Sequence, residues 1–213
     1  MKAVLIYSGG LDSTTLLYDC KDSIQLAVSF DYGSRHNARE IAFAAEHCQN
    51  LAIRHLVIPL DFIGTYFRSS LLKGGEAIPE GNYDDENMRS TVVPFRNGIM
   101  LAIATGLAES NGLDAVLLAN HSGDHAIYPD CRPSFIDAMD AAAQAGTYNG
   151  VRIVSPYCHL SKRDIALRGR ELGVDFSRTY SCYQGGEKHC GRCGTCRERK
   201  EALDGFDPTE YED

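Results

Sequence analysis

The chain has 213 residues, of which 44% are hydrophobic and 23% charged, and its formal net charge is -8. A length that suits one domain and a composition close to globular averages exclude a disordered or fibrous protein. No run approaches the roughly 20 apolar residues of a membrane span, and the acidic balance disfavours nucleic acid as a partner. The apolar run before Ser8 is too short for a signal peptide, so we expect a cytoplasmic protein with no membrane partner.

The predicted elements alternate between strands and helices in chain order. Strands are expected at 2–7, 24–30, 55–60, 114–119 and 151–154, and helices at 11–20, 37–51, 95–110, 133–145 and 161–172. This alternation predicts an α/β fold, with a parallel five-stranded sheet and helices on both faces. Ligands of such folds bind beyond the carboxyl ends of the strands.

Three segments interrupt the alternation. Residues 73–91 are polar and rich in Gly, Asn and Asp, which indicates a long loop or a lid. Residues 120–132 follow the fourth strand and are polar, and residues 181–196 combine many Cys and Gly with no helix or strand period. We therefore expect an α/β domain over 1–180 and a small module over 181–213 that packs on it.

The segment Ser8-Gly9-Gly10-Leu11-Asp12-Ser13 follows the first strand and opens a helix. Glycines let backbone N–H groups approach an anion, and a helix N-terminus adds partial positive charge. The hydroxyls of Ser8, Ser13 and Thr14 add donors, so the element is suited to phosphate. It lacks the lysine of a Walker A loop and the Gly-x-Gly-x-x-Gly dinucleotide fingerprint. The alternative is an ordinary turn in which Asp12 or Ser13 caps the helix.

Four cysteines with tight spacing predict a metal centre near the C-terminus. They follow the pattern Cys-x₇-Cys-x₂-Cys-x₂-Cys and are Cys182, Cys190, Cys193 and Cys196. Four thiolates suit tetrahedral Zn²⁺, and a site with all four positions filled is structural. We expect one zinc ion per chain. An iron–sulfur cluster accepts the same spacing, and unligated thiols are the remaining alternative.

The segment 8–13 resembles the pyrophosphate loop of the N-type ATP pyrophosphatases, which adenylate a substrate oxygen and release pyrophosphate. The resemblance implies an adenine nucleotide alpha hydrolase-like fold, with Asp12 near Mg²⁺ and the adenosine near the end of the second strand. The ATP-binding residues it implies are Ser8, Gly9, Gly10, Leu11, Asp12, Ser13, Thr14, Phe30, Tyr32 and Gly33. Related enzymes place a phosphate-binding lysine in a segment similar to that of Lys162.

Nearly the whole chain resembles the 7-cyano-7-deazaguanine synthases of queuosine and archaeosine precursor synthesis. The resemblance rests on residues 8–13, 31–36, 93–97, 128–135 and the cysteine segment that starts at Thr179. Phe95 departs from the family, which often has glycine or a small or polar residue there. The resemblance implies an ATP-dependent carbon–nitrogen ligase that joins 7-carboxy-7-deazaguanine to ammonia and ends at a nitrile. It also implies acyl-adenylate and amide intermediates and a homodimer.

Several polar residues fit such chemistry. The catalytic candidates are Asp12, Ser13, Lys162 and Arg96. The candidates for substrate binding are Arg35, His36, Arg96, Asn97, Asp124, Tyr128, Asp130 and Arg132. A guanidinium at Arg96 suits a carboxylate, and a carboxylate suits the N1–H and amino group of a deazaguanine, with Asp130 the first choice and Asp124 the second. Each candidate has a plainer alternative, as a surface residue or a turn residue.

Two other functions compete with this interpretation. One is a related enzyme of the same superfamily that adenylates and amidates or conjugates a different carboxylate. The chain has no added glutaminase domain, and no basic appendage of the kind expected of a tRNA thiolase. The other is a nucleotide sensor without turnover, which has no need for the polar cluster at 120–132.

Overall fold

The computed structural model describes residues 1–82 and 86–212, and its centre is a sheet of five parallel strands. The strands pair in the order β3–β2–β1–β4–β5. Their bounds are Ala3–Ile6 (β1), Ile24–Asp31 (β2), Arg54–Pro59 (β3), Ala115–Leu117 (β4) and Arg152–Val154 (β5). The predicted α/β fold with a parallel five-stranded sheet is therefore confirmed, with each strand within two residues of its expected start.

The helices are placed as expected, with two additions. Their bounds are Leu11–Asp19 (α1), Asn37–Asn50 (α2), Asp61–Tyr66 (α3), Arg96–Ser110 (α4), Pro133–Gly146 (α5), Lys162–Glu171 (α6) and Gly194–Ala202 (α7). The short helix α3 was not predicted. Neither was α7, which begins inside the segment expected to have no helix. Its buried face includes Thr195, Cys196 and Arg199, so the apolar period that normally indicates a helix is absent.

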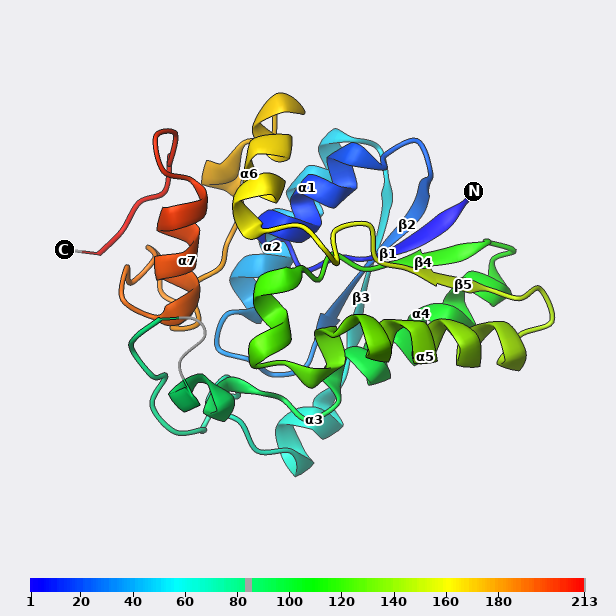
Figure 1. Cartoon of the computed structure of the whole chain (residues 1–213), viewed down its shortest axis with the longest axis horizontal. Helices are drawn as coiled ribbons and strands as arrows, with labels where there is room; N and C mark the ends of the chain where they lie inside the picture. Colours follow the sequence, from blue (N-terminus) through cyan, green and yellow to red (C-terminus); the bar gives the residue numbers. More distant parts are fainter. Residues whose placement is uncertain (83–85, 213) are drawn as a thin grey trace.

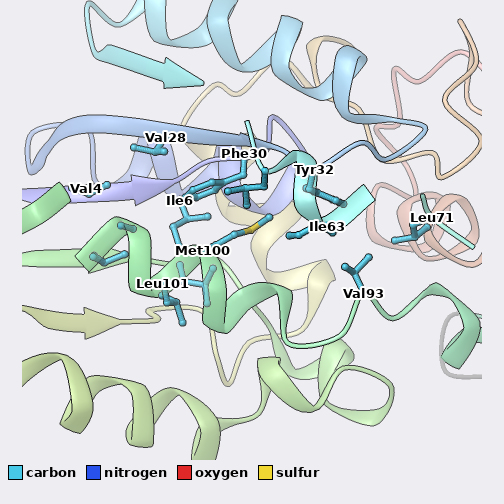
Figure 2. Packing of buried hydrophobic residues seen from close by; sticks show 14 of the residues in the cluster. Val4, Ile6, Val28, Phe30, Tyr32, Ile63, Leu71, Val93, Met100 and Leu101 are labelled. Atoms are coloured by element: carbon cyan, nitrogen blue, oxygen red, sulfur yellow. The ribbon is translucent and has the colours of Figure 1, made fainter. Parts of the chain in front are cut away.

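Alternate residues of β1 face opposite sides of the sheet, as the pleat requires. Leu5 packs with α1, α2 and α6 residues, whereas Val4 and Ile6 pack with residues of α4 and α5. Figure 1 shows α1 and α6 on one side of the sheet and α4 and α5 on the other. Figure 2 shows the second of these layers, in which Met100 and Leu101 of α4 lie against the strands. Both faces of the sheet are thus buried, which is the condition for a stable parallel sheet.

The strand order reverses direction at β1. The chain moves from β1 outward to β2 and β3, then returns to add β4 and β5 on the other side of β1. In doubly wound sheets a crevice opens at this point, beyond the carboxyl ends of the two strands. The loops that follow β1 and β4 therefore meet at one place. The cysteine segment and α7 lie at this end of the sheet (Figure 1).

The long polar segment 73–91 is attached to the domain at both ends. Arg35 donates hydrogen bonds to the carbonyl groups of Gly75 and Glu76, and Met88 in the 3₁₀ helix Glu86–Thr91 is fully buried. Residues 83–85 of the predicted lid lie outside the described residues. Within residues 1–82 and 86–212, no helix is both long and apolar enough to cross a membrane.

Candidate active site

The loop between β1 and α1 is shaped by one glycine. Gly9 has φ +90°, and a Cβ at this position would lie 2.2 Å from the carbonyl oxygen of Glu40. Only glycine tolerates both conditions. Ser8 Oγ accepts the Gly10 N–H at 3.1 Å and lies 3.0 Å from Ser13 Oγ, so the loop is closed by its own groups. No side chain caps α1, which leaves its N-terminal N–H groups able to bind an anion.

A cavity of about 220 Å³ lies over this loop, at the end of the sheet where the strand order reverses. Most of the residues predicted for ATP and substrate line it. They are Ser8, Gly10, Leu11, Asp12, Ser13, Phe30, Tyr32, His36, Arg96, Asn97, Asp124, Tyr128 and Lys162. One cavity thus brings together side chains from sequence segments between residues 8 and 162.

A cluster of charged side chains forms one wall of the cavity. Lys162 Nζ lies 3.1 Å from Asp12 Oδ2 and 2.9 Å from Glu198 Oε2. Lys162 is the first residue of α6, because Ser161 accepts the Asp164 N–H and caps the helix. Glu198 comes from α7, so the C-terminal module supplies a side chain to this cluster.

The electrostatics of the cluster keep its central pair charged. Burial disfavours the ammonium of Lys162, but the carboxylates of Asp12 and Glu198 raise its pKa above the usual value. Burial likewise acts to raise the pKa of Asp12, yet Lys162 and His121 hold it below the usual value. The site therefore presents a fixed positive charge beside the phosphate loop, together with an ionised carboxylate.

His121 follows β4 and faces the same carboxylates. Its Nδ1 accepts the Gly123 N–H at 3.1 Å, so the proton of the neutral ring lies on Nε2. That nitrogen lies 3.9 Å from Asp12 Oδ2 and 3.7 Å from Asp124 Oδ1. The ring thus links the loop after β4 to the loop after β1.

On the opposite side of the cavity, Arg96 begins α4. Its Nη1 donates to Tyr32 Oη at 2.9 Å, and the guanidinium lies 5.3 Å from the centre of the Tyr32 ring. Burial acts to lower the pKa of Arg96, but Tyr32 and Asp130 raise it above its usual value. Arg96 is a partly buried cation with further N–H donors that can bind a carboxylate.

Six of the residues predicted to bind ATP or substrate do not line the cavity. Gly9 and Gly33 are turn residues with positive φ, and Thr14 Oγ1 lies 3.1 Å from Tyr7 Oη. Arg35 holds the start of segment 73–91. Asp130 accepts the Asn97 N–H at 2.9 Å and so stabilises the start of α4, and the exposed Arg132 donates to the carbonyl of His125.

Three residues of the site were missed in the sequence. His121 and Glu198 join the Asp12–Lys162 pair, and Glu40 lines the cavity from the first turn of α2. None belongs to a contiguous motif. The position of His121 directly after a strand, where ligands of parallel sheets bind, was the one signal that could have found it.

The four cysteines predicted to bind metal are brought together and buried. Their ligand atoms all lie within 4.8 Å of one another, and Cys190 Sγ lies 3.9 Å from Cys196 Sγ. Tetrahedral thiolates about 2.3 Å from zinc lie about 3.8 Å apart, so the arrangement fits a zinc ion. The backbone N–H groups of Arg192 and Cys193 donate to Cys190 Sγ at 3.5 and 3.4 Å.

The family-model comparison matches residues 2–207 to the family described as "Queuosine biosynthesis protein QueC". The chain belongs to the QueC family. A relative from Porphyromonas gingivalis (strain ATCC 33277) is 62% identical over 99% of this chain and 97% of its own. Relatives from Desulfotalea psychrophila and Rhizobium johnstonii are 54% and 50% identical, over 98% and 100% of this chain and 98% and 93% of theirs. All three are named 7-cyano-7-deazaguanine synthase, so this QueC family member is an enzyme.

One solved structure supports the fold. An NMN synthetase from Francisella tularensis superposes with a TM-score of 0.52 over 98% of this chain and 79% of its own. The two sequences are 14% identical. The likeness confirms that this QueC chain has the α/β architecture of that synthetase.

Proposed function

We propose that this QueC family member is a 7-cyano-7-deazaguanine synthase, a ligase that uses ATP to convert 7-carboxy-7-deazaguanine and ammonia to the nitrile. The full-length similarity to synthases of that name carries the proposal. The cavity supports it, because one wall suits polyphosphate and the other offers the partly buried guanidinium of Arg96 for a carboxylate.

ATP would bind with its phosphates over Gly10 and Ser13, near the ammonium of Lys162. Mg²⁺ fits beside them, since Asp12 Oδ1 is buried and has no hydrogen-bond partner among the described residues. A hard divalent cation prefers such carboxylate oxygens. When bound, Mg²⁺ would neutralise negative charge on the phosphates. Phe30 and Tyr32, at the end of β2, would lie near the adenosine.

The second substrate would lie between Arg96 and the loop after β4. Arg96 and Asn97 can orient the carboxylate toward the α-phosphate. Asp130 was the first choice for the N1–H and amino group of the deazaguanine, but its carboxylate is used by the start of α4. The carboxylate of Asp124 likewise accepts a backbone N–H, that of His121, but Asp124 lines the cavity whereas Asp130 does not, so Asp124 is now the preferred candidate, with Tyr128 also in the lining.

The chemistry requires two rounds of adenylation. A carboxylate has two oxygens and a nitrile has none, and each oxygen leaves readily only as part of a better leaving group. The first ATP makes an acyl adenylate, which ammonia converts to the amide with loss of AMP. The second ATP adenylates the amide oxygen, and loss of AMP and a proton gives the nitrile. One phosphate loop serves both rounds, because both present an oxygen to the same α-phosphorus.

Water must be kept from the acyl adenylate, which it would otherwise hydrolyse. We propose that the described parts of segment 73–91, residues 73–82 and 86–91, cover the bound substrates as a lid. Zinc, held by the four cysteines, would have a structural role. We also propose that the enzyme is a cytoplasmic homodimer, and light scattering of the purified protein would test the dimer.

The stoichiometry provides the test. We expect two AMP and two pyrophosphate per nitrile when the enzyme receives 7-carboxy-7-deazaguanine, ammonium and Mg-ATP, with products followed by mass spectrometry. The amide, supplied with ATP and no ammonium, should also give the nitrile. Accumulation of ADP and phosphate, or an amide that is not converted, would contradict the mechanism. Adenylation of a different carboxylate alone would favour a related ligase, and absence of any AMP would favour a sensor.

A further inference from the structure

Glu40 is a carboxyl group in the cavity that the roles above do not use. It lies in the first turn of α2, its side chain is 14% exposed, and it lines the cavity. Its Oε1 lies 3.8 Å from the point that a Cβ on Gly10 would occupy, so the carboxyl group is next to the phosphate loop. Its carboxyl oxygens accept no hydrogen bond from the described residues, and His36 Nε2 is 3.8 Å from Oε2.

A carboxylate at this place needs a cation or a proton. An unpaired Glu40 carboxylate would repel the phosphates of ATP, and no interaction would compensate for the free energy that its burial costs. His36 does not supply the charge, since burial and the nearby Arg96 lower the pKa of His36 to about 3. The Nη1 of Arg96 is directed at Tyr32. The carboxyl group is therefore available to a small ligand that enters the cavity and carries positive charge and N–H donors.

The proposed reaction needs such a ligand. Ammonia reaches a protein at neutral pH mostly as ammonium, which has no lone pair with which to attack. A base must take one proton within the cavity, close to the acyl adenylate. Burial, opposed by Arg96, raises the pKa of Glu40 to about 8, which suits proton exchange near neutral pH.

We propose that Glu40 binds ammonium and removes its proton, so that ammonia is released beside the acyl adenylate. This inference rests on the proposed function. One proton passes from nitrogen to the Glu40 carboxylate, and the freed lone pair forms the new C–N bond. The bond between the acyl carbon and the AMP oxygen then breaks, and AMP leaves with that electron pair. A second proton moves from nitrogen to the departing phosphate, which leaves a neutral primary amide.

Measuring amide formation and nitrile formation separately distinguishes a role of Glu40 in ammonium use from a structural role. Amide formation consumes ammonium, whereas conversion of the amide to the nitrile does not. In Glu40→Gln, kcat/KM for ammonium chloride should fall about 100-fold in amide formation, the size typical of a general base. The KM for ATP and the rate from amide to nitrile should stay near those of the wild type. Glu46→Gln, on the same helix but paired with Arg178, is the matched control and should leave both halves unchanged.

The outcomes are distinct. Equal loss of both half-reactions in Glu40→Gln, or an unchanged response to ammonium, would overturn the role of Glu40 while the proposed function stands. A wild-type enzyme that forms neither amide nor nitrile would overturn the proposed function and this inference together. Retained conversion of the amide by Glu40→Gln also shows that the variant is folded, so loss of the first half-reaction cannot be attributed to misfolding.

Discussion

At the scale of single residues, the site contains largely buried side chains of opposite charge that neutralise one another. Lys162 lies between Asp12 and Glu198, and it neutralises charge that would otherwise be buried without compensation. Asp12 has one oxygen directed at Lys162 and another with no partner among the described residues. The same carboxylate thus has a structural contact and an unused ligand atom.

Substitution of Asp12 tests whether its unpartnered oxygen, Oδ1, contributes to adenylation. Asp12→Asn keeps the shape of the side chain but removes its charge, so adenylation should slow on the order of 100-fold, as when one electrostatic contact of a transition state is lost. AMP release under single-turnover conditions measures the effect, and circular dichroism checks the fold. Asp22→Asn, at an exposed position after α1, is the control. Near-normal AMP release by Asp12→Asn would contradict the role.

Glu40 should leave a signature in the pH dependence of stability. Because its pKa is raised from 4.5 to about 8 by burial, the folded chain keeps a proton that the unfolded chain releases. Its contribution to the free energy of unfolding therefore decreases as the pH rises from 4.5 to about 8. Glu40→Gln has no proton to lose, so it should gain stability relative to the wild type across this window. Urea unfolding at several pH values measures the difference.

The groups that face Glu40 are His36 on its own helix, Arg96 on α4 and Tyr32 at the end of β2. They are present in both proteins, so their own titrations largely cancel in the comparison. A difference that stays constant over the whole window would show that Glu40 ionises in the folded chain as it does in the unfolded one.

At the scale of elements, the sequence predicted those features that are determined by one contiguous segment of the chain. The loop at 8–13 and the four cysteines are contiguous motifs, and the alternating periods located all five strands. Topology determines the rest. Glu40, His121 and Glu198 come from segments that are far apart. Glu40 lines the cavity, and His121 and Glu198 lie beside Asp12 and Lys162 at its wall. Asp130 is a motif residue that has a contact the sequence does not reveal, since it accepts the Asn97 N–H at the start of α4, and its role in substrate binding stays a prediction.

The start of α4 carries an unusual backbone conformation. Phe95 precedes the helix with φ +54° and ψ +25°, a left-handed conformation that glycine tolerates and other residues adopt at a cost. A glycine at this position would be compatible with the turn. The ring of Phe95 packs edge-on against Phe135 at a centroid distance of 5.6 Å, which offsets part of the cost.

Two substitutions of Phe95 distinguish the energetic cost of its backbone conformation from the contribution of its ring. Phe95→Ala and Phe95→Gly both remove the contact with Phe135, but only glycine relieves the left-handed strain. The glycine variant should be more stable than the alanine variant by about 1 kcal/mol, as judged by denaturant unfolding. An alanine variant as stable as the glycine variant would mean that the backbone relaxes away from this conformation.

At the scale of the whole molecule, the cysteine module is continuous with the α/β domain. The four cysteines belong to the same packed cluster as Val4 and Phe30, and Leu203 belongs to the cluster on the other face of the sheet. Arg199 is fully buried and donates to Phe176, Thr179, Ser181 and Thr209. The boundary at residue 180 stays a prediction, and these contacts suggest that neither part would be stable alone.

Metal content tests the module directly. Elemental analysis should find about one zinc per chain and no iron. Cys182→Ser should lose the metal and lower the melting temperature, since metal binding and folding are coupled. Cys20→Ser, at a half-buried cysteine outside the cluster, should keep both. Iron with visible absorbance, or a Cys182→Ser protein with unchanged zinc content, would contradict the assignment.

Glu198 lies two residues beyond Cys196, on the helix that begins inside the metal-binding segment. If a metal held by the four cysteines orders α7, a chain without that metal would lose the contact between Glu198 and Lys162. Such a chain should be a poor ATPase as well as a poor ligase.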